Sequence, residues 1–169
     1  MFEWVNPANL RRGLFYAAVI IMALAVQNEF FGRFSILGVR VFYMPVLVSA
    51  IGVFEGGFWG GIMGMITGVI CDMTYHDTTV TYTIVLTLLG FASGLVFRFF
   101  VNRKLFSFTV VSAAALILTG FCQMLRPLVL QRCDVMSGIR VVLLQSLWSL
   151  PFVFPIYSGM KKLAEPEDK

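Results

Sequence analysis

The stretch Gly56-Gly-Phe-Trp-Gly60-Gly-Ile-Met-Gly64-Met-Ile-Thr-Gly68-Val-Ile-Cys-Asp72 decides the fold of this chain. A small or acidic residue stands at every fourth position: Gly56, Gly60, Gly64, Gly68 and Asp72. Residues four apart lie on one face of a helix, so the glycines form a ridge without side chains that another backbone can approach closely. A glycine-rich phosphate loop is excluded, because no Lys-Ser or Lys-Thr follows and the run is apolar. The ridge therefore predicts a tightly packed pair of membrane helices.

The next apolar segment carries a matching stripe of small residues. Its members are Thr79, Thr83, Thr87, Gly90 and Gly94, and the segment ends at Arg98. Only a short loop joins the two segments, so they form a hairpin and are plausible packing partners. The predicted helix-packing residues are Gly56, Gly60, Gly64, Gly68, Gly90 and Gly94.

The composition extends this membrane character to the whole chain. Of the 169 residues, 59% are hydrophobic and 13% are charged, whereas soluble domains carry about 25% charged residues. A spanning helix needs roughly 20 residues, so the chain holds at most about seven spans. We therefore expect no catalytic or receptor domain outside the membrane within these residues. The three cysteines are odd in number, which argues against a disulfide framework.

Long apolar runs between charges predict an all-α polytopic membrane protein with six transmembrane helices. The expected spans are about Leu14–Phe31, Val41–Phe54, Gly57–Met73, Val80–Val101, Leu105–Leu125 (with an alternative end at Leu130) and Ile139–Met160. They form one domain over residues 1–163, followed by a polar cytoplasmic tail over 164–169. Pro151 and Pro155 should kink the last span, because each removes a backbone hydrogen bond. Arg11-Arg12 and Ala23-Leu24-Ala25 imitate a cleavable signal peptide, but the downstream segments are also apolar, which favours a retained span.

The distribution of basic residues predicts that both termini are cytoplasmic. Six spans place the termini on one side, which then holds eight Lys and Arg residues against five on the other. Basic residues concentrate on the cytoplasmic side of membrane proteins. The net charge of +4 therefore reflects topology, and no basic segment suits nucleic acid.

Polar side chains near the span ends are the candidate functional residues. They are Gln27, Asp72, Arg98, Gln123, Arg126 and Gln145. Depth matching along the helices pairs Asp72 with Arg126. The three glutamines fit either hydrogen bonds between helices or a polar-lined substrate pocket. His76 is the only histidine and no carboxylate cluster accompanies it, so no metal, cofactor or catalytic residue is expected.

The order and spacing of these features resemble the bacterial rod-shape-determining MreD family. The similar elements are the Gly-rich third span ending in Ile70-Cys71-Asp72, Gly90-Phe91 in the fourth, and Val26-Gln27 closing the first. The last span, from Trp148-Ser-Leu-Pro151 to Lys161-Lys162, also fits the pattern. The chain departs from it at Met73-Thr-Tyr-His-Asp77, where the family commonly has Gly-Pro or Gly-Ser. A second departure is Pro45, which is displaced inward from the start of the second span.

The resemblance implies a non-catalytic inner-membrane scaffold of the cell-elongation machinery. Such a protein associates with MreC and supports the glycosyltransferase RodA and a class B transpeptidase in lateral peptidoglycan synthesis. It also implies a fold similar to the substrate-binding subunits of energy-coupling-factor vitamin transporters. A small-molecule-binding transporter subunit is therefore the alternative function. The first span lacks the Ala-x-x-x-Ala motif of those subunits, because Ile21 and Met22 follow Ala17 and Ala18.

Overall fold

The described part of the chain is almost entirely helical and contains no strand. The computed structural model describes residues 7–31, 41–74, 80–99, 105–130 and 135–164. Its elements are α1 (Pro7–Val26), a π-helical turn (Gln27–Phe31), α2 (Met44–Glu55), α3 (Gly57–Thr74), α4 (Thr81–Phe99), α5 (Leu105–Val129), α6 (Val135–Ser149), a 3-10 turn (Leu150–Phe152) and α7 (Val153–Ala164). The predicted all-α class is confirmed for these residues.

Among the described residues, three helical segments are long and apolar enough to cross a membrane. They are Thr81–Phe99, Leu105–Leu125 and Val135–Lys162, the last of which combines α6 and α7. Gly13–Glu29 and Met44–Glu55 are apolar but shorter. The chain thus has the character of a multi-pass membrane protein, and each of the six expected segments coincides with a helical unit.

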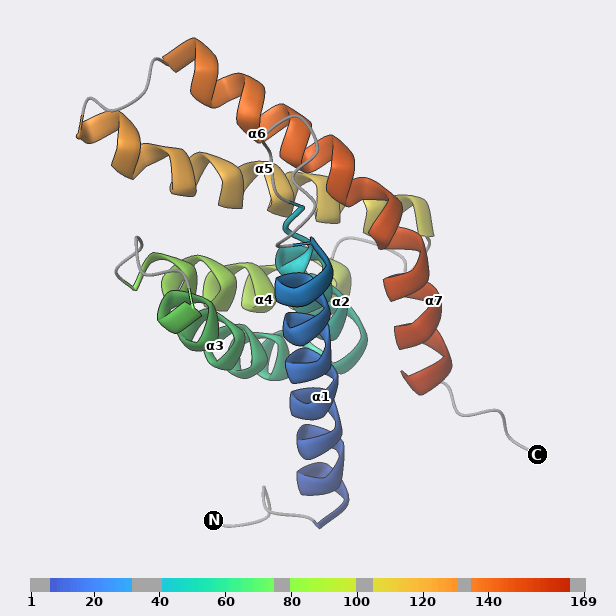
Figure 1. Cartoon of the computed structure of the whole chain (residues 1–169). Helices are drawn as coiled ribbons and strands as arrows, with labels where there is room; N and C mark the ends of the chain where they lie inside the picture. Colours follow the sequence, from blue (N-terminus) through green and yellow to red (C-terminus); the bar gives the residue numbers. More distant parts are fainter. Residues whose placement is uncertain (1–6, 32–40, 75–79, 100–104, 131–134, 165–169) are drawn as a thin grey trace.

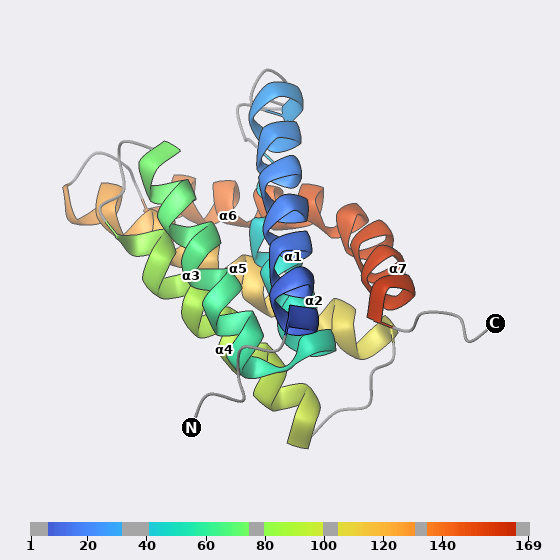
Figure 2. The ribbon, with the colours of Figure 1, turned by 90° about the horizontal axis from the view of Figure 1, so that it is seen from below.

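The helices pack around α2, which occupies the centre of the molecule (Figures 1 and 2). Every residue from Val41 to Phe54 is buried. A helix that is apolar on all sides is stable only when other helices surround it, and α2 contacts α1, α3, α4, α5 and α7. Its 12 residues extend only about 18 Å, less than the roughly 30 Å of a bilayer core. The second predicted span is therefore a short internal helix.

Prolines set two of the helix boundaries. The 3-10 turn at Leu150–Phe152 contains Pro151 and separates α6 from α7, as the predicted kink requires. Pro45 lies in the first turn of α2, where a missing N–H leaves no hydrogen bond unmade. The helix begins at Met44, later than the sequence suggested. Pro45 is therefore at the start of this helix and is not displaced into it.

The first and last helices, α1 and α7, have their outer ends toward one side of the helical assembly. In Figure 1, α1 begins and α7 ends in the lower part of the view. The polar tail predicted over residues 164–169 lies outside the described residues, apart from Ala164, which closes α7.

Candidate functional site

Three helices meet at a junction of glycines in the core. A Cβ added to Gly60 would collide with the carbonyl oxygen of Gly90 and with the Cα of Gly52. A Cβ on Gly52 would collide with the same Gly90 oxygen and with Ser93 Oγ. The backbones of α2, α3 and α4 therefore touch directly at this point, which is possible only without side chains.

The contact continues along the α3–α4 hairpin in antiparallel register. Beyond Gly60, a Cβ on Gly64 would meet Leu86, and one on Gly68 would meet the backbone of Thr83. At the other end, Gly94 lies against Gly57. Each successive contact is therefore one helical turn later in α3 and one turn earlier in α4, as expected for an antiparallel pair. The structure places Gly60, Gly64, Gly68, Gly90 and Gly94 in the packing role predicted for them, and α3 and α4 lie side by side in Figures 1 and 2.

Gly56 is the exception, and its predicted packing role is wrong. No atom lies within 4 Å of a Cβ built at this position. Its φ of +99° instead closes α2 before α3 begins, a conformation that side chains disfavour. Sequence reasoning missed Gly52 and Gly57, because neither belongs to the four-residue period.

Asp72 caps the first turn of α4 from the end of α3. The N–H of Tyr82 donates to Asp72 Oδ1 at 3.1 Å. The N–H and the hydroxyl of Thr83 donate to Oδ2 at 2.9 and 2.6 Å. A helix usually takes such a cap from its own N-cap side chain, but Val80 offers no oxygen. In an apolar medium each unsatisfied N–H costs several kcal/mol, so this carboxylate is a structural element of the hairpin.

The predicted Asp72–Arg126 pair stays a prediction. Arg126 belongs to α5, but its side chain lies outside the described residues. Arg98 is exposed one residue before the end of α4, and its guanidinium lies 5.5 Å from the ring centre of Phe99. Thr79 of the small-residue stripe and His76 also fall outside the described part.

Polar side chains tie the segment before α2 to its neighbours. The Phe42 N–H donates to the Ser149 hydroxyl oxygen of α6 at 3.3 Å. That hydroxyl donates to the Gln145 carbonyl of its own helix at 2.8 Å, and the Phe42 carbonyl lies 3.3 Å from it. Tyr43 donates its hydroxyl to the Ala23 carbonyl of α1 at 2.6 Å. The Tyr16 hydroxyl of α1 also donates to Glu55 Oε1. These bonds join α1 to α2 and to the segment before it, and α6 to that segment.

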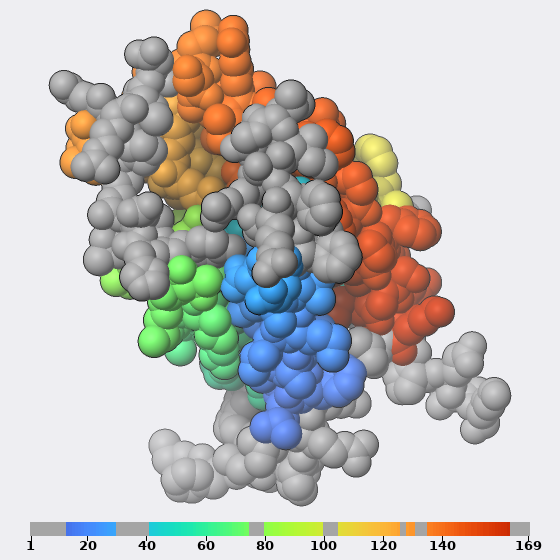
Figure 3. Space-filling model, viewed as in Figure 1, coloured from blue at the N-terminus to red at the C-terminus, as the bar shows by residue number. Residues whose placement is uncertain are grey.

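An apolar groove separates α1 from α7, with α2 at its base. We call it the α1–α7 groove; its volume is about 440 Å³, and it is lined by Val19, Val26, Tyr43, Leu47, Phe152, Pro155, Ile156, Gly159 and Met160. The two helices are neighbours on the face drawn in Figure 3, α1 in blue and α7 in red. Nothing lies within 4 Å of a Cβ built at Gly159. The groove thus has unfilled space beside a backbone.

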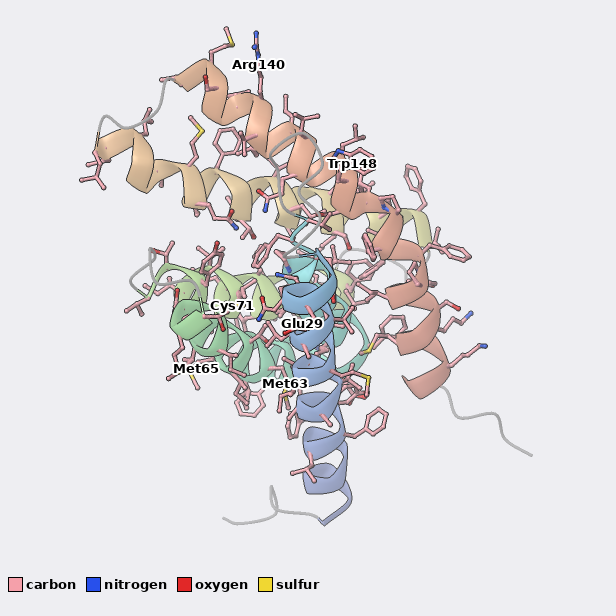
Figure 4. The ribbon with its side chains drawn as sticks, in the orientation of Figure 1. Glu29, Met63, Met65, Cys71, Arg140 and Trp148 are labelled. Atoms are coloured by element: carbon pink, nitrogen blue, oxygen red, sulfur yellow. The ribbon has the colours of Figure 1, made fainter. Side chains whose placement is uncertain are left out.

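A smaller hollow, the α5–α6 cavity, lies between the next pair of helices. Its volume is about 280 Å³, and it is lined by Gly120, Gln123, Met124, Ser137, Gly138, Val141, Val142 and Gln145. Among the described residues, the buried Nε2 of Gln123 has no hydrogen-bond partner. Leaving such a donor unsatisfied costs about 1–3 kcal/mol. Arg140 projects from α6 away from this cavity (Figure 4).

The three predicted glutamines do not form one site. Gln123 and Gln145 share the α5–α6 cavity, whereas Gln27 is buried in the π-helical turn after α1. Within the described ranges, no group of three His, Cys, Asp or Glu side chains could hold a metal ion.

Comparisons with known proteins give no relatives for this chain. No protein family, curated protein or solved structure matches it.

Proposed function

We propose that this chain is a non-catalytic membrane scaffold that docks the single transmembrane helix of a partner protein. The α1–α7 groove is the observation that supports the proposal most directly. Membrane helices associate by close packing at small residues. Gly159 supplies such a position at the edge of the groove, with open space beside its backbone.

The core supports a structural role as well. The glycine contacts among α2, α3 and α4 make a tightly packed unit, and hydrogen bonds join α1 and α6 to the segment that leads into α2. The groove lies between α1 and α7 with α2 at its base, and it would therefore present a defined surface to a partner helix. Preorganisation of this kind favours specific association.

The partner and pathway follow from the resemblance described above. We propose six membrane-embedded segments with both termini in the cytoplasm of a bacterium, and an MreC-like single-span protein as the groove's occupant. Through it the chain would support the RodA-type glycosyltransferase and class B transpeptidase that build the lateral wall. The fold proposed for this role is similar to that of the transporter substrate-binding subunits.

Gly159→Leu tests the proposal without disturbing the scaffold itself. A side chain at this position meets no atom within 4 Å of its Cβ, and replacing Gly inside a helix removes a cost of about 0.8–1 kcal/mol. The variant should therefore fold at least as well as the parent. Its new side chain should occupy the groove, reduce co-purification with the co-expressed MreC-like protein at least about tenfold, and make rod-shaped cells round.

Phe154→Leu is the matched control. Phe154 lies on the same helix, is exposed, and does not line the groove, so this change should leave both the complex and the cell shape intact. Normal co-purification and normal cell shape with Gly159→Leu would overturn the proposal.

The α5–α6 cavity favours a second candidate, the small-molecule-binding subunit of an energy-coupling-factor transporter. Two amide side chains and a hydroxyl in an otherwise apolar wall are typical of a ligand site. The volume of about 280 Å³ is just below the usual range of about 300–1,000 Å³. Retention of a vitamin through purification, with cell shape unaffected by depletion, would favour this candidate over the scaffold.

A further inference from the structure

At the α5–α6 cavity, one hydrogen-bond donor has no partner in the part of the chain that the structure describes. Gln123 is one of the lining residues, and its buried Nε2 has no partner among the described residues. Around it the wall is mostly apolar, with Met124, Val141 and Val142 contributing side chains. Such a site calls for an occupant that brings one hydrogen-bond acceptor and a large apolar remainder.

Water does not fit this requirement. At roughly 30 Å³ each, about nine water molecules would fill the cavity, and each would need two to four polar partners. The lining supplies three polar side chains, Gln123, Ser137 and Gln145. Most of the waters would therefore face apolar groups.

The lining carries no charged group, so the hydrogen-bond acceptor of the occupant must be neutral. None of the eight lining residues is ionisable, and an unpaired charge inside a membrane is costly. A carbonyl oxygen meets this condition, whereas a carboxylate or a phosphate does not.

The level of the cavity within the bilayer indicates which molecule supplies that carbonyl. The 25 residues of α5 extend about 37 Å, and a bilayer core is about 30 Å thick. Gln123 precedes the end of α5 by six residues, or about 9 Å. In a centred helix its amide lies within about 6 Å of the edge of the hydrocarbon core, close to the ester groups of phospholipids.

We propose that the α5–α6 cavity binds one acyl chain of a phospholipid, whose ester carbonyl accepts a hydrogen bond from the Gln123 amide. Ser137 lies nearer the headgroups, in the first turn of α6, and the apolar wall holds the chain. Gly138 leaves room for the side chain of Met124, which a Cβ at position 138 would meet. This site is separate from the α1–α7 groove and does not depend on the function proposed for it.

The test uses the whole protein in vesicles of phosphatidylethanolamine and phosphatidylglycerol. A trace phospholipid carries a photoreactive diazirine on its second acyl chain near the ester, and a matched lipid has an ether in place of that ester. After irradiation, peptide mapping measures label at the cavity residues relative to exposed residues elsewhere, such as Met65 of α3. We expect the ester lipid to label the cavity about fivefold more than the ether lipid does, as the loss of one hydrogen bond implies.

Gln123→Leu should bring the labelling by the ester lipid down to the level of the ether lipid. Thr109→Val is the control on the same helix: it removes a hydroxyl that donates only to its own helix, at Leu105, and should change nothing. Equal cavity labelling by the ester and ether lipids in the unaltered protein would overturn the proposal. Label spread evenly over all lipid-facing residues would overturn it as well.

Discussion

Gly64→Ala probes the closest approach of α3 and α4. A Cβ at position 64 would lie 2.8 Å from the carbonyl carbon of Leu86 and 3.1 Å from the Cα of Thr87. Ordinary contacts of this kind are 3.4–4 Å. The neighbouring atoms are backbone and cannot rotate away, so the two helices must move apart.

The expected loss of stability follows from this displacement of the two helices. A gap of about 0.5–1 Å forfeits a quarter to a half of the dispersion energy of the atoms concerned, and overpacking costs typically about 1–3 kcal/mol. Alanine recovers about 0.8–1 kcal/mol through its higher helix propensity. Because the obstruction is rigid, we expect a net loss of about 2 kcal/mol. Gly64→Leu should reduce the yield of folded protein further.

Gly61→Ala is the matched control on the same helix. Its Cβ would lie 3.6 Å from the Cβ of Phe91, an ordinary contact, so the helix-propensity gain of up to about 1 kcal/mol should remain. Thermal denaturation in detergent, followed by size-exclusion chromatography, compares the two variants with the parent. The denaturation midpoint should fall for Gly64→Ala and stay or rise for Gly61→Ala. Equal midpoints would refute the close packing of α3 against α4.

Three further predictions concern polar groups and topology. Asp72→Ala should destabilise the hairpin by about 1–2 kcal/mol, because two N–H groups of α4 lose their cap. The same denaturation assay measures this loss, and an unchanged midpoint would contradict the capping role of Asp72. Asp72→Asn and Arg126→Gln should be less than additive if the two residues form a pair, whereas strict additivity would exclude it. In a cysteine-free background, Thr78→Cys should react with an impermeant thiol reagent in intact cells and Glu167→Cys should not; the reverse result would invert the topology.

Periodic features of the sequence predicted much of the fold. The four-residue glycine period identified α3 and its packing on α4 because a regular helix repeats its contacts along one face. Hydropathy located the helical segments, since apolar length is a property of a single segment. Pro151 marked the break between α6 and α7 because it acts on its own backbone.

The missed features depend on helices that are distant in the sequence. Gly52 stands alone in an apolar run, so nothing local indicates that it meets Gly60 and Gly90. The role of Asp72 as a cap depends on Val80 lacking a side-chain oxygen and on the path of the hairpin. Gln123 and Gln145 share a cavity only because α5 and α6 lie side by side. The sequence indicates how far along its helix a residue lies. It does not indicate which neighbouring helix that residue faces, because this depends on how each helix is rotated about its axis.

Site-specific photo-crosslinking in living cells tests the central claim most directly. A photoreactive phenylalanine analogue replaces Ile156 in the α1–α7 groove or, as a control, Met65, which is exposed on α3. Both variants must support rod shape before they are compared. The account predicts a crosslink to the single-span MreC-like partner from position 156 and none from position 65. Crosslinking of the partner from position 65 alone, or from neither position in cells of normal shape, would contradict the assignment of the groove as the docking site.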